Sequence, residues 1–247
     1  VCEEYNIPCM AESTAFVDLN GTIVGASVVQ DQYGNGALCM EWLAEHYSDY
    51  WDTDLSDSSA VGLIPITFSG VTGINDRVPG ITDAFKEAFP NSADNIFVAD
   101  LVSVGFSVQG AYDLVSSQIT STDGIEKWLI VACVDDWATG ATRAVESVGM
   151  EDDVLITCVQ GNAFVNEMNS GYTGSTWVSC CYIPEKDFSE NMAAGLVALV
   201  DGRATLDTLW PEDVPDGAKA PCKEIQGTMV TKDTYEEFLE TQVITFD

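Results

Sequence analysis

Three polar residues of this chain stand where strands of a sheet would end or where a helix would begin. Asp135 and Gln160 each come directly after an apolar run, and Arg77 stands at the start of an amphipathic helical pattern. The carboxyl ends of parallel strands meet at one edge of a sheet, together with helix amino termini whose N–H groups lack partners. An arginine fork, a carboxylate and an amide suit the adjacent hydroxyl groups of a small polar molecule. We therefore predict that these three side chains share one edge and bind such a ligand.

Phe106 extends this candidate site with an aromatic ring that could cover the apolar face of a ligand. A structural interpretation stands beside each of these assignments. Arg77 could form a surface ion pair, Asp135 could cap the helix that follows it, and Phe106 could belong to the core. Gln160 lies in a turn that leads to Gly161, where a scaffold role explains an amide less well, so binding is favoured there.

The elements that would position these residues alternate between β-rich apolar runs and helical patterns. The runs are Ala60 to Phe68, Asn95 to Leu101, Lys127 to Val134 and Asp153 to Val159. The helical patterns include 37–47, 78–88, 106–119, 136–148 and 185–200, and a strand at 224–231 and a helix at 232–240 close the chain. Strands that are apolar throughout are covered on both faces, which is typical of a parallel sheet flanked by helices. We predict an α/β fold.

The charge balance excludes one large class of partners. Forty acidic residues against nine basic ones give a formal net charge of −31 over 247 residues. Such a surface repels phosphate backbones, so we predict no nucleic-acid partner. The longest apolar run is too short to span a membrane.

Catalytic and metal-binding patterns are weak in this sequence. No Ser or Cys is visibly paired with a base, and the single histidine, His46, is expected on a solvated helix face. Asp49, Asp52, Asp54 and Asp57 lack the central glycine and final glutamate of the calcium-loop spacing, which favours a solvated loop. We predict no catalytic residue, no metal ligand and no cofactor.

Eight cysteines occur without the two-residue spacing of zinc or redox motifs. We interpret most of them as buried apolar residues. An even number would also permit disulfides in an exported protein, and spacing does not decide between these alternatives.

The stretch WLIVACVDDWATGATRAVESVGMEDDVLITCVQGNAFVNEMNSG, residues 128–171, resembles the signature of the type I periplasmic binding proteins, which include ribose-, galactose- and arabinose-binding proteins. The later TGSTWVSCCYIP, the DGR at 201–203 and the closing GTMVTKDTYEEF are similar to the carboxyl-terminal half of that family. Within this family, the sequence resembles the arabinose-binding proteins most. The resemblance implies a two-lobed fold with parallel sheets and an incomplete amino-terminal lobe.

The resemblance also implies roles for individual residues. Arg77, in NDRVPGITDAF, falls at the ligand-binding arginine of the family, and Gln160, in CVQG, falls at its Asp or Asn. Glu12 lies near the acidic sugar contact of the family, and Phe106 lies in the region that supplies a contact from the second lobe. Val134 stands where the family usually has a ligand-binding Asn, and this departure leaves the identity of the ligand open.

By the same resemblance the lobes are discontinuous in sequence. Residues 1–30 and 181–225 would form the remainder of the amino-terminal lobe, and residues 31–180 and 226–247 the other lobe. Hinge crossovers are expected near 31, 180 and 226. Ligand binding would then proceed by hinge closure of the lobes around a small sugar.

The function that the resemblance implies is that of an extracytoplasmic solute-binding protein, periplasmic or lipid-anchored, that delivers a sugar to an ABC transporter permease. The alternative is the effector-sensing domain of a LacI-like transcriptional regulator, which shares the fold. An enzyme is the remaining alternative, and the weak catalytic patterns count against it.

Overall fold

The computed structural model describes residues 2, 4–5 and 7–243, and the chain divides into two compact units. Unit 1 comprises Val1–Asp31, Ile183–Gln226 and Leu239–Asp247, and unit 2 comprises Gln32–Tyr182 and Gly227–Phe238. Each unit is therefore assembled from segments that are distant in the sequence. The predicted 226–247 segment of the second lobe is split by this division, since Leu239 and the residues after it group with unit 1.

The core of unit 2 is a parallel sheet. Its strands lie in the order β6, β5, β7 and β8, and every pairing among them is parallel. Their bounds are Ala99–Asp100 for β6, Val61–Thr67 for β5, Lys127–Ala132 for β7 and Val154–Cys158 for β8. All residues of β5 and β8 are buried, as expected for strands covered on both faces.

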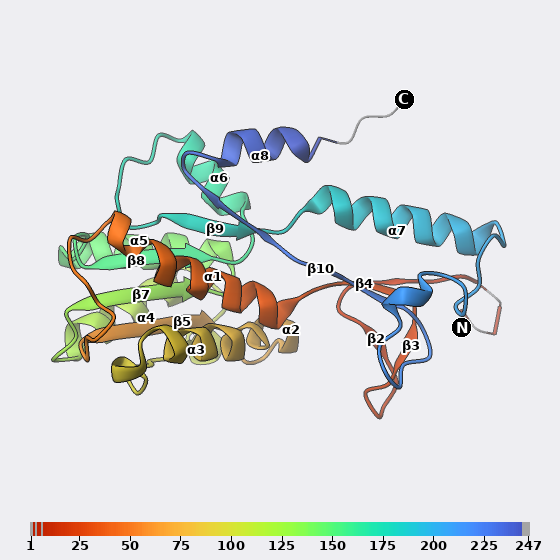
Figure 1. The fold of residues 1–247 in the computed structure, drawn as a ribbon, viewed down its shortest axis with the longest axis horizontal. Helices are drawn as coiled ribbons and strands as arrows, with labels where there is room; N and C mark the ends of the chain where they lie inside the picture. The colour runs from red at the N-terminus through yellow and green to blue at the C-terminus, as the bar shows by residue number, and fades with distance from the viewer. Residues whose placement is uncertain (1, 3, 6, 244–247) are drawn as a thin grey trace. The chain divides into compact units, whose positions relative to one another are not determined.

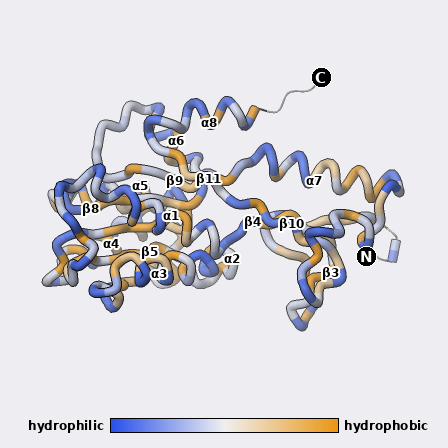
Figure 2. The backbone as a smooth tube through the Cα atoms, in the orientation of Figure 1, coloured by the Kyte–Doolittle hydropathy of each residue, from blue (hydrophilic) through white to orange (hydrophobic). Residues whose placement is uncertain are grey.

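Two further strands extend this sheet beyond β8. Parallel bridges join Ile156 to Trp177 and Val159 to Cys181, and they bring β9 (Ser179–Tyr182) alongside β8. β11 (Thr228–Thr231) pairs with β9 in the antiparallel direction. Figure 2 shows apolar stretches running through the strands of unit 2.

The helices of unit 2 pack in pairs over the sheet. α1 contacts α3 and α4 contacts α5, and Figure 1 shows the two pairs on opposite faces of the sheet. The helix bounds are Gln32–His46 for α1, Thr72–Asn75 for α2, Arg77–Ala88 for α3, Val108–Ser121 for α4, Asp135–Val148 for α5 and Asn162–Asn169 for α6. The prediction of an α/β fold with helices flanking a parallel sheet is confirmed.

Two glycines permit the close packing of α1 against α3. A Cβ atom on Gly36 would lie 2.2 Å from the Arg77 carbonyl oxygen, and one on Gly80 would lie 2.1 Å from the Tyr33 carbonyl oxygen. Neither site has room for a side chain, because the neighbouring atom belongs to the main chain of the other helix. This approach brings the first turn of α3, which carries Arg77, against α1.

Unit 1 is built around a smaller parallel sheet. β4 (Ser27–Gln30) lies between β1 (Ala11–Ser13) and β10 (Cys222–Ile225), and both pairings are parallel. β2 (Phe16–Val17) and β3 (Ile23–Gly25) form an antiparallel hairpin. α7 (Glu185–Val200) contacts β4, and α8 (Tyr235–Thr241) spans the boundary between the segments of the two units.

One predicted element is wrong. The single strand predicted at 224–231 is two strands, β10 and β11, which belong to different sheets. The chain passes from unit 1 to unit 2 between them, at Gln226 and Gly227. The β-rich pattern of the sequence continues from β10 into β11, whereas the strand with which the chain pairs changes between them.

None of the eight cysteines forms a disulfide, and six of them are buried. The prediction that most of them are buried apolar residues is confirmed. Burial raises the pKa of the Cys133 thiol to about 12. A thiol with such a pKa stays protonated at neutral pH and is a poor nucleophile.

Candidate ligand-binding site

The carboxyl ends of the central strands of unit 2 meet at one edge. Ala132, at the end of β7, pairs with Ile66 of β5 on one side and with Cys158 of β8 on the other. The residues that follow these strands therefore emerge side by side. Arg77, Phe106, Asp135 and Gln160 all belong to unit 2 and lie in segments that follow its parallel strands.

Arg77 is almost fully buried, with 3% of its surface exposed. Its Nε donates to the Gln32 side-chain oxygen at 2.7 Å, and one terminal nitrogen donates to the Cys133 main-chain oxygen just beyond β7. The alternative of a surface ion pair is therefore wrong, because the guanidinium is buried and anchored on a main-chain oxygen. Gln32, at the start of α1, was not predicted as part of the site, and its position before an amphipathic helix is only a weak signal.

The environment of Arg77 is unfavourable to a charge. Burial lowers the pKa of the guanidinium from its ordinary value, while nearby thiols and the Asp135 carboxylate act in the opposite direction. An arginine stays charged even so, since its reference pKa lies far above neutral.

Asp135 is the first residue of α5 and is 6% exposed. One carboxylate oxygen accepts from the main-chain N–H of Ala163 at 2.6 Å, and the other accepts from that of Asp136 at 3.1 Å. Ala163 lies in the first turn of α6, so this carboxylate accepts from one main-chain N–H in the first turn of each of the two helices. Burial raises the pKa of the carboxyl group, and these hydrogen bonds oppose the shift.

Gln160 adopts the left-handed conformation, with φ of 75°, which is uncommon for a residue other than glycine. Its main-chain N–H donates to the Cys181 carbonyl at 2.9 Å and ties the turn to β9. Its side-chain amide has no hydrogen-bond partner among the described residues, and the residue is partly exposed. A strained turn that presents an unpartnered amide is a feature of binding sites.

Phe106 lies in the loop before α4 and is 52% exposed. Its ring contacts Phe68 at a centroid distance of 5.4 Å and Trp137 at 4.8 Å, both in edge-on geometry. The ring is held in place on one side and is open on the other. Phe106 is therefore not a core residue, and its exposed face is suited to contact with a ligand.

Glu12 lies in β1 of unit 1, where it pairs with Val28 of β4 and is exposed. The other four predicted residues lie in unit 2, so the contacts within unit 2 do not include Glu12. Its predicted role as a ligand contact stays a prediction.

Two acidic residues of the loop that was predicted to be solvated, Asp49 and Asp54, have hydrogen-bond partners nearby. Asp49 accepts from His46 Nδ1 at 2.9 Å, and Asp54 accepts from the main-chain N–H of Ser56 at 3.0 Å. Within the described part of the chain, no three Asp, Glu, His or Cys side chains are grouped so as to hold a metal ion. No helix among the described residues is long and apolar enough to cross a membrane.

No family model matches the chain, and no curated protein sequence matches it either. Solved structures do match it. An ABC transporter periplasmic solute-binding protein from Actinobacillus succinogenes with bound D-allose is 18% identical, with a TM-score of 0.68, and the match covers 96% of this chain and 73% of that one. An arabinose-binding protein from Geobacillus stearothermophilus is 11% identical, with a TM-score of 0.69 and coverage of 96% and 72%.

A LacI family transcriptional regulator from Enterococcus faecium with bound ribose is also similar. It is 14% identical, with a TM-score of 0.62, and the match covers 93% of this chain and 71% of that one. The predicted fold is thereby confirmed, and the partial coverage of these structures fits an incomplete lobe. The chain has the α/β fold of the type I periplasmic binding proteins.

Proposed function

We propose that this chain is a sugar-binding protein that holds its ligand at the carboxyl edge of the unit 2 sheet. The proposal is supported by a buried arginine, a carboxylate, an unpartnered amide and an exposed aromatic ring, all in segments that follow the parallel strands of that sheet. This combination supplies donors, acceptors and an apolar face, which a sugar ring needs together. Proteins with the same fold hold D-allose and ribose in their solved structures.

Each side chain has a distinct part in the proposed site. Arg77 places a positive charge at the site from a position fixed by Gln32 and the Cys133 carbonyl. Gln160 offers an amide that both donates and accepts, and Phe106 offers the exposed face of a braced ring. Asp135 uses an oxygen on each of two N–H groups, and the remaining lone pairs are available to a ligand hydroxyl.

The proposed role is solute capture for an ABC transporter permease outside the cytoplasm. Similarity to periplasmic solute-binding proteins supports it. The formal charge of −31 also supports it over the regulator alternative, because a strongly acidic surface weakens DNA binding. The similarity to a LacI family regulator keeps the effector-sensing alternative in view. No catalytic role is proposed.

Isothermal titration calorimetry with D-allose, L-arabinose and D-ribose tests the proposal. We expect at least one of the three sugars to bind, and Gln160→Ala to weaken that binding about tenfold or more through lost hydrogen bonds. Arg143→Ala is the matched control, since Arg143 is exposed on the middle of α5. Absence of heat with all three sugars, or equal losses in both variants, would count against the proposed site.

A second measurement separates transport from regulation. Cell fractionation of the natural host, with an antibody against this chain, is expected to place it outside the cytoplasm. Recovery with the cytoplasmic fraction would favour the regulator alternative.

A further inference from the structure

Two exposed thiols lie together in unit 1. Cys2 and Cys9 are the exposed cysteines of the chain, and the other six cysteines are buried. The side chains of Cys2 and Cys9 share a hydrogen bond, so their sulfur atoms are in contact. Because a disulfide needs two sulfur atoms close together on side chains that face each other, such a contact is the starting point for one.

Main-chain hydrogen bonds hold this thiol pair from both sides. The N–H of Ile7 donates to the Cys2 carbonyl oxygen at 2.8 Å and folds the chain back toward Cys2. On the other side, the N–H of Ala11 at the start of β1 donates to the Ala26 carbonyl oxygen at 2.9 Å and anchors the chain just after Cys9. The contact between the thiols therefore follows from a turn and a strand pairing, and not only from the rotation of two side chains.

Access to solvent distinguishes the exposed pair from the other neighbouring thiols. Cys39 shares a hydrogen bond with Cys181, and Cys158 shares one with Cys180. The exposed fraction of each of these four residues is 0%. A thiol that a dissolved oxidant cannot reach is inert even beside a second thiol. The exposed pair combines proximity with access, and these buried pairs do not.

We propose that Cys2 and Cys9 are a redox-active pair, which a small-molecule disulfide such as oxidised glutathione converts to an intramolecular disulfide. The bond closes residues 2–9 into a ring directly before β1, which is an outer strand of the unit 1 sheet. Disulfides persist in oxidising compartments outside the cytoplasm. The inference agrees with the proposed location of the chain but does not depend on the proposed sugar site.

The exchange takes place in two steps. The Cys2 thiolate attacks one sulfur of oxidised glutathione, whose S–S bond breaks to give a mixed disulfide on Cys2 and one glutathione thiolate. Cys9 then loses its proton and attacks the Cys2 sulfur, which forms the Cys2–Cys9 bond and releases the second glutathione thiolate. The protein gives up two electrons and two protons, and one glutathione disulfide becomes two thiols. Burial and the neighbouring Cys2 raise the pKa of the Cys9 thiol, which is why the first attack is assigned to Cys2.

Peptide mapping of the whole chain tests this inference. The reduced protein is incubated with oxidised glutathione, quenched with acid, and digested without reduction by a protease that cleaves after glutamate. Because Glu4 lies between the two cysteines, the peptides that carry Cys2 and Cys9 separate unless a disulfide joins them. We expect a joined pair of peptides, lighter by two hydrogen atoms and separated by a reductant. Iodoacetamide labelling before digestion should show the loss of both reactive thiols, whereas the buried cysteines should react only after denaturation.

Variants separate the two steps of the exchange. Cys9→Ser is expected to stop at the mixed disulfide and to keep one glutathione on Cys2, and Cys2→Ser is expected to take up glutathione at least about tenfold more slowly. Cys222→Ala, which removes the buried cysteine of unit 1, is the control and should form the Cys2–Cys9 bond as the unsubstituted chain does.

Three results would overturn the inference. The first is that the peptides of Cys2 and Cys9 stay separate after treatment with oxidised glutathione. The second is that the unsubstituted chain keeps glutathione on Cys2, since a neighbouring thiol should displace it. The third is that Cys2 or Cys9 becomes joined to another cysteine or to a second chain.

Discussion

Arg77 combines a proposed binding role with a structural one. Sequence reasoning led us to expect that Arg77→Ala weakens ligand binding more than tenfold and leaves folding unchanged. The burial of the guanidinium and its bond to the Cys133 carbonyl change the second part of that expectation. Removing a buried donor leaves its acceptor unsatisfied and leaves space behind.

We therefore predict that Arg77→Ala lowers the free energy of unfolding by about 2 kcal/mol or more. Urea denaturation followed by circular dichroism measures this change. Arg143→Ala, at an exposed position, should stay within about 0.5 kcal/mol of the unsubstituted chain. Equal stability of the unsubstituted chain and Arg77→Ala would show that the guanidinium is not needed by the fold.

Asp135 should make stability depend on pH in a defined direction. Its pKa is raised from 3.8 in the folded state, chiefly by burial, so the folded chain binds a proton more tightly than the unfolded chain. The stabilisation that this carboxyl group contributes is therefore present below about pH 3.8, and it is lost as the pH rises through the raised pKa of the folded state. An amide at this position accepts a hydrogen bond and does not titrate.

We predict that Asp135→Asn removes this loss. Across the range that begins near pH 3.8 and extends upward, the free energy of unfolding of the variant should fall less than that of the unsubstituted chain. Urea denaturation at a series of pH values measures both slopes. A steeper fall in the variant would contradict the assignment of this pKa shift to Asp135.

At the scale of elements, the contact between α1 and α3 decides where Arg77 lies. The two helices approach through Gly36 and Gly80, and each glycine faces a carbonyl of the opposite helix. A wider spacing would displace the first turn of α3 and with it the bond from Arg77 to Cys133. Helix packing and the site are therefore linked through these small residues.

We predict that Gly36→Ala costs about 1–3 kcal/mol of stability, because its Cβ would lie 2.2 Å from the Arg77 carbonyl oxygen. Thermal unfolding measures the loss, and sugar affinity should fall with it if the proposed site is correct. Glu41→Ala, exposed on the same helix, is the control and should change stability little. An unchanged Tm in Gly36→Ala would show that the helices separate without cost.

At the scale of the whole molecule, the topology makes unit 2 depend on a distant segment. β11 covers the edge of β9, and the main-chain N–H of Gly227 donates to the buried Asn35 side-chain oxygen at 2.7 Å. Residues 32–182 alone lack both features. Their loss exposes a strand edge and leaves a buried acceptor without that donor.

We predict that a fragment of residues 32–182 is less stable than a single chain in which 227–238 is joined to it by a flexible linker. The midpoint of urea denaturation for both fragments measures the contribution of β11. Identical midpoints would mean that β9 does not need its antiparallel partner. The same comparison with Asn35→Ala in the linked fragment separates the strand pairing from the Gly227 hydrogen bond.

The sequence by itself determined the elements whose signals are local. Glu185–Val200 was predicted with its observed bounds, and Gly149 was predicted as the end of α5, where it has a φ of 70°. β5, β7 and β8 were predicted within two residues at either end, because runs of apolar residues report burial on both faces. Because Asp135 follows β7 and Gln160 follows β8, the predicted strands also place these two residues at one edge of the sheet.

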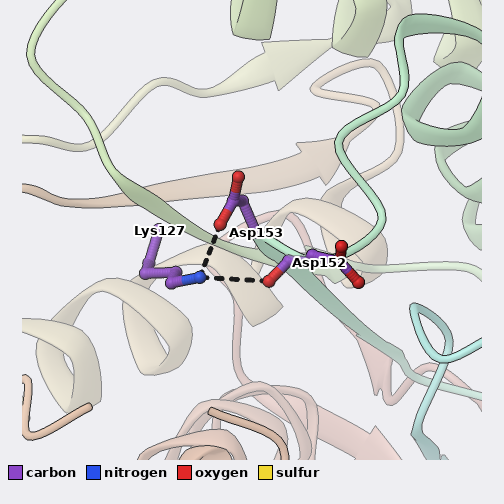
Figure 3. A network of polar contacts seen from close by, with 3 residues as sticks. All are labelled: Lys127, Asp152 and Asp153. Carbon is purple, nitrogen blue, oxygen red and sulfur yellow. Dashed lines mark hydrogen bonds and ion pairs between the residues drawn. The ribbon is translucent and has the colours of Figure 1, made fainter. Parts of the chain in front are cut away.

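Only the tertiary structure decided what depends on contacts between distant segments. The sequence around Arg77 cannot show that Gln32 and Cys133 will bury it, and the β pattern at 224–231 cannot show that its pairing partners change at Gly227. The ion pair between Lys127 and Asp153, shown in Figure 3, likewise joins two segments that no recognisable motif links. Local periodicity specifies an element, whereas burial and partnership are set by which elements the fold brings together.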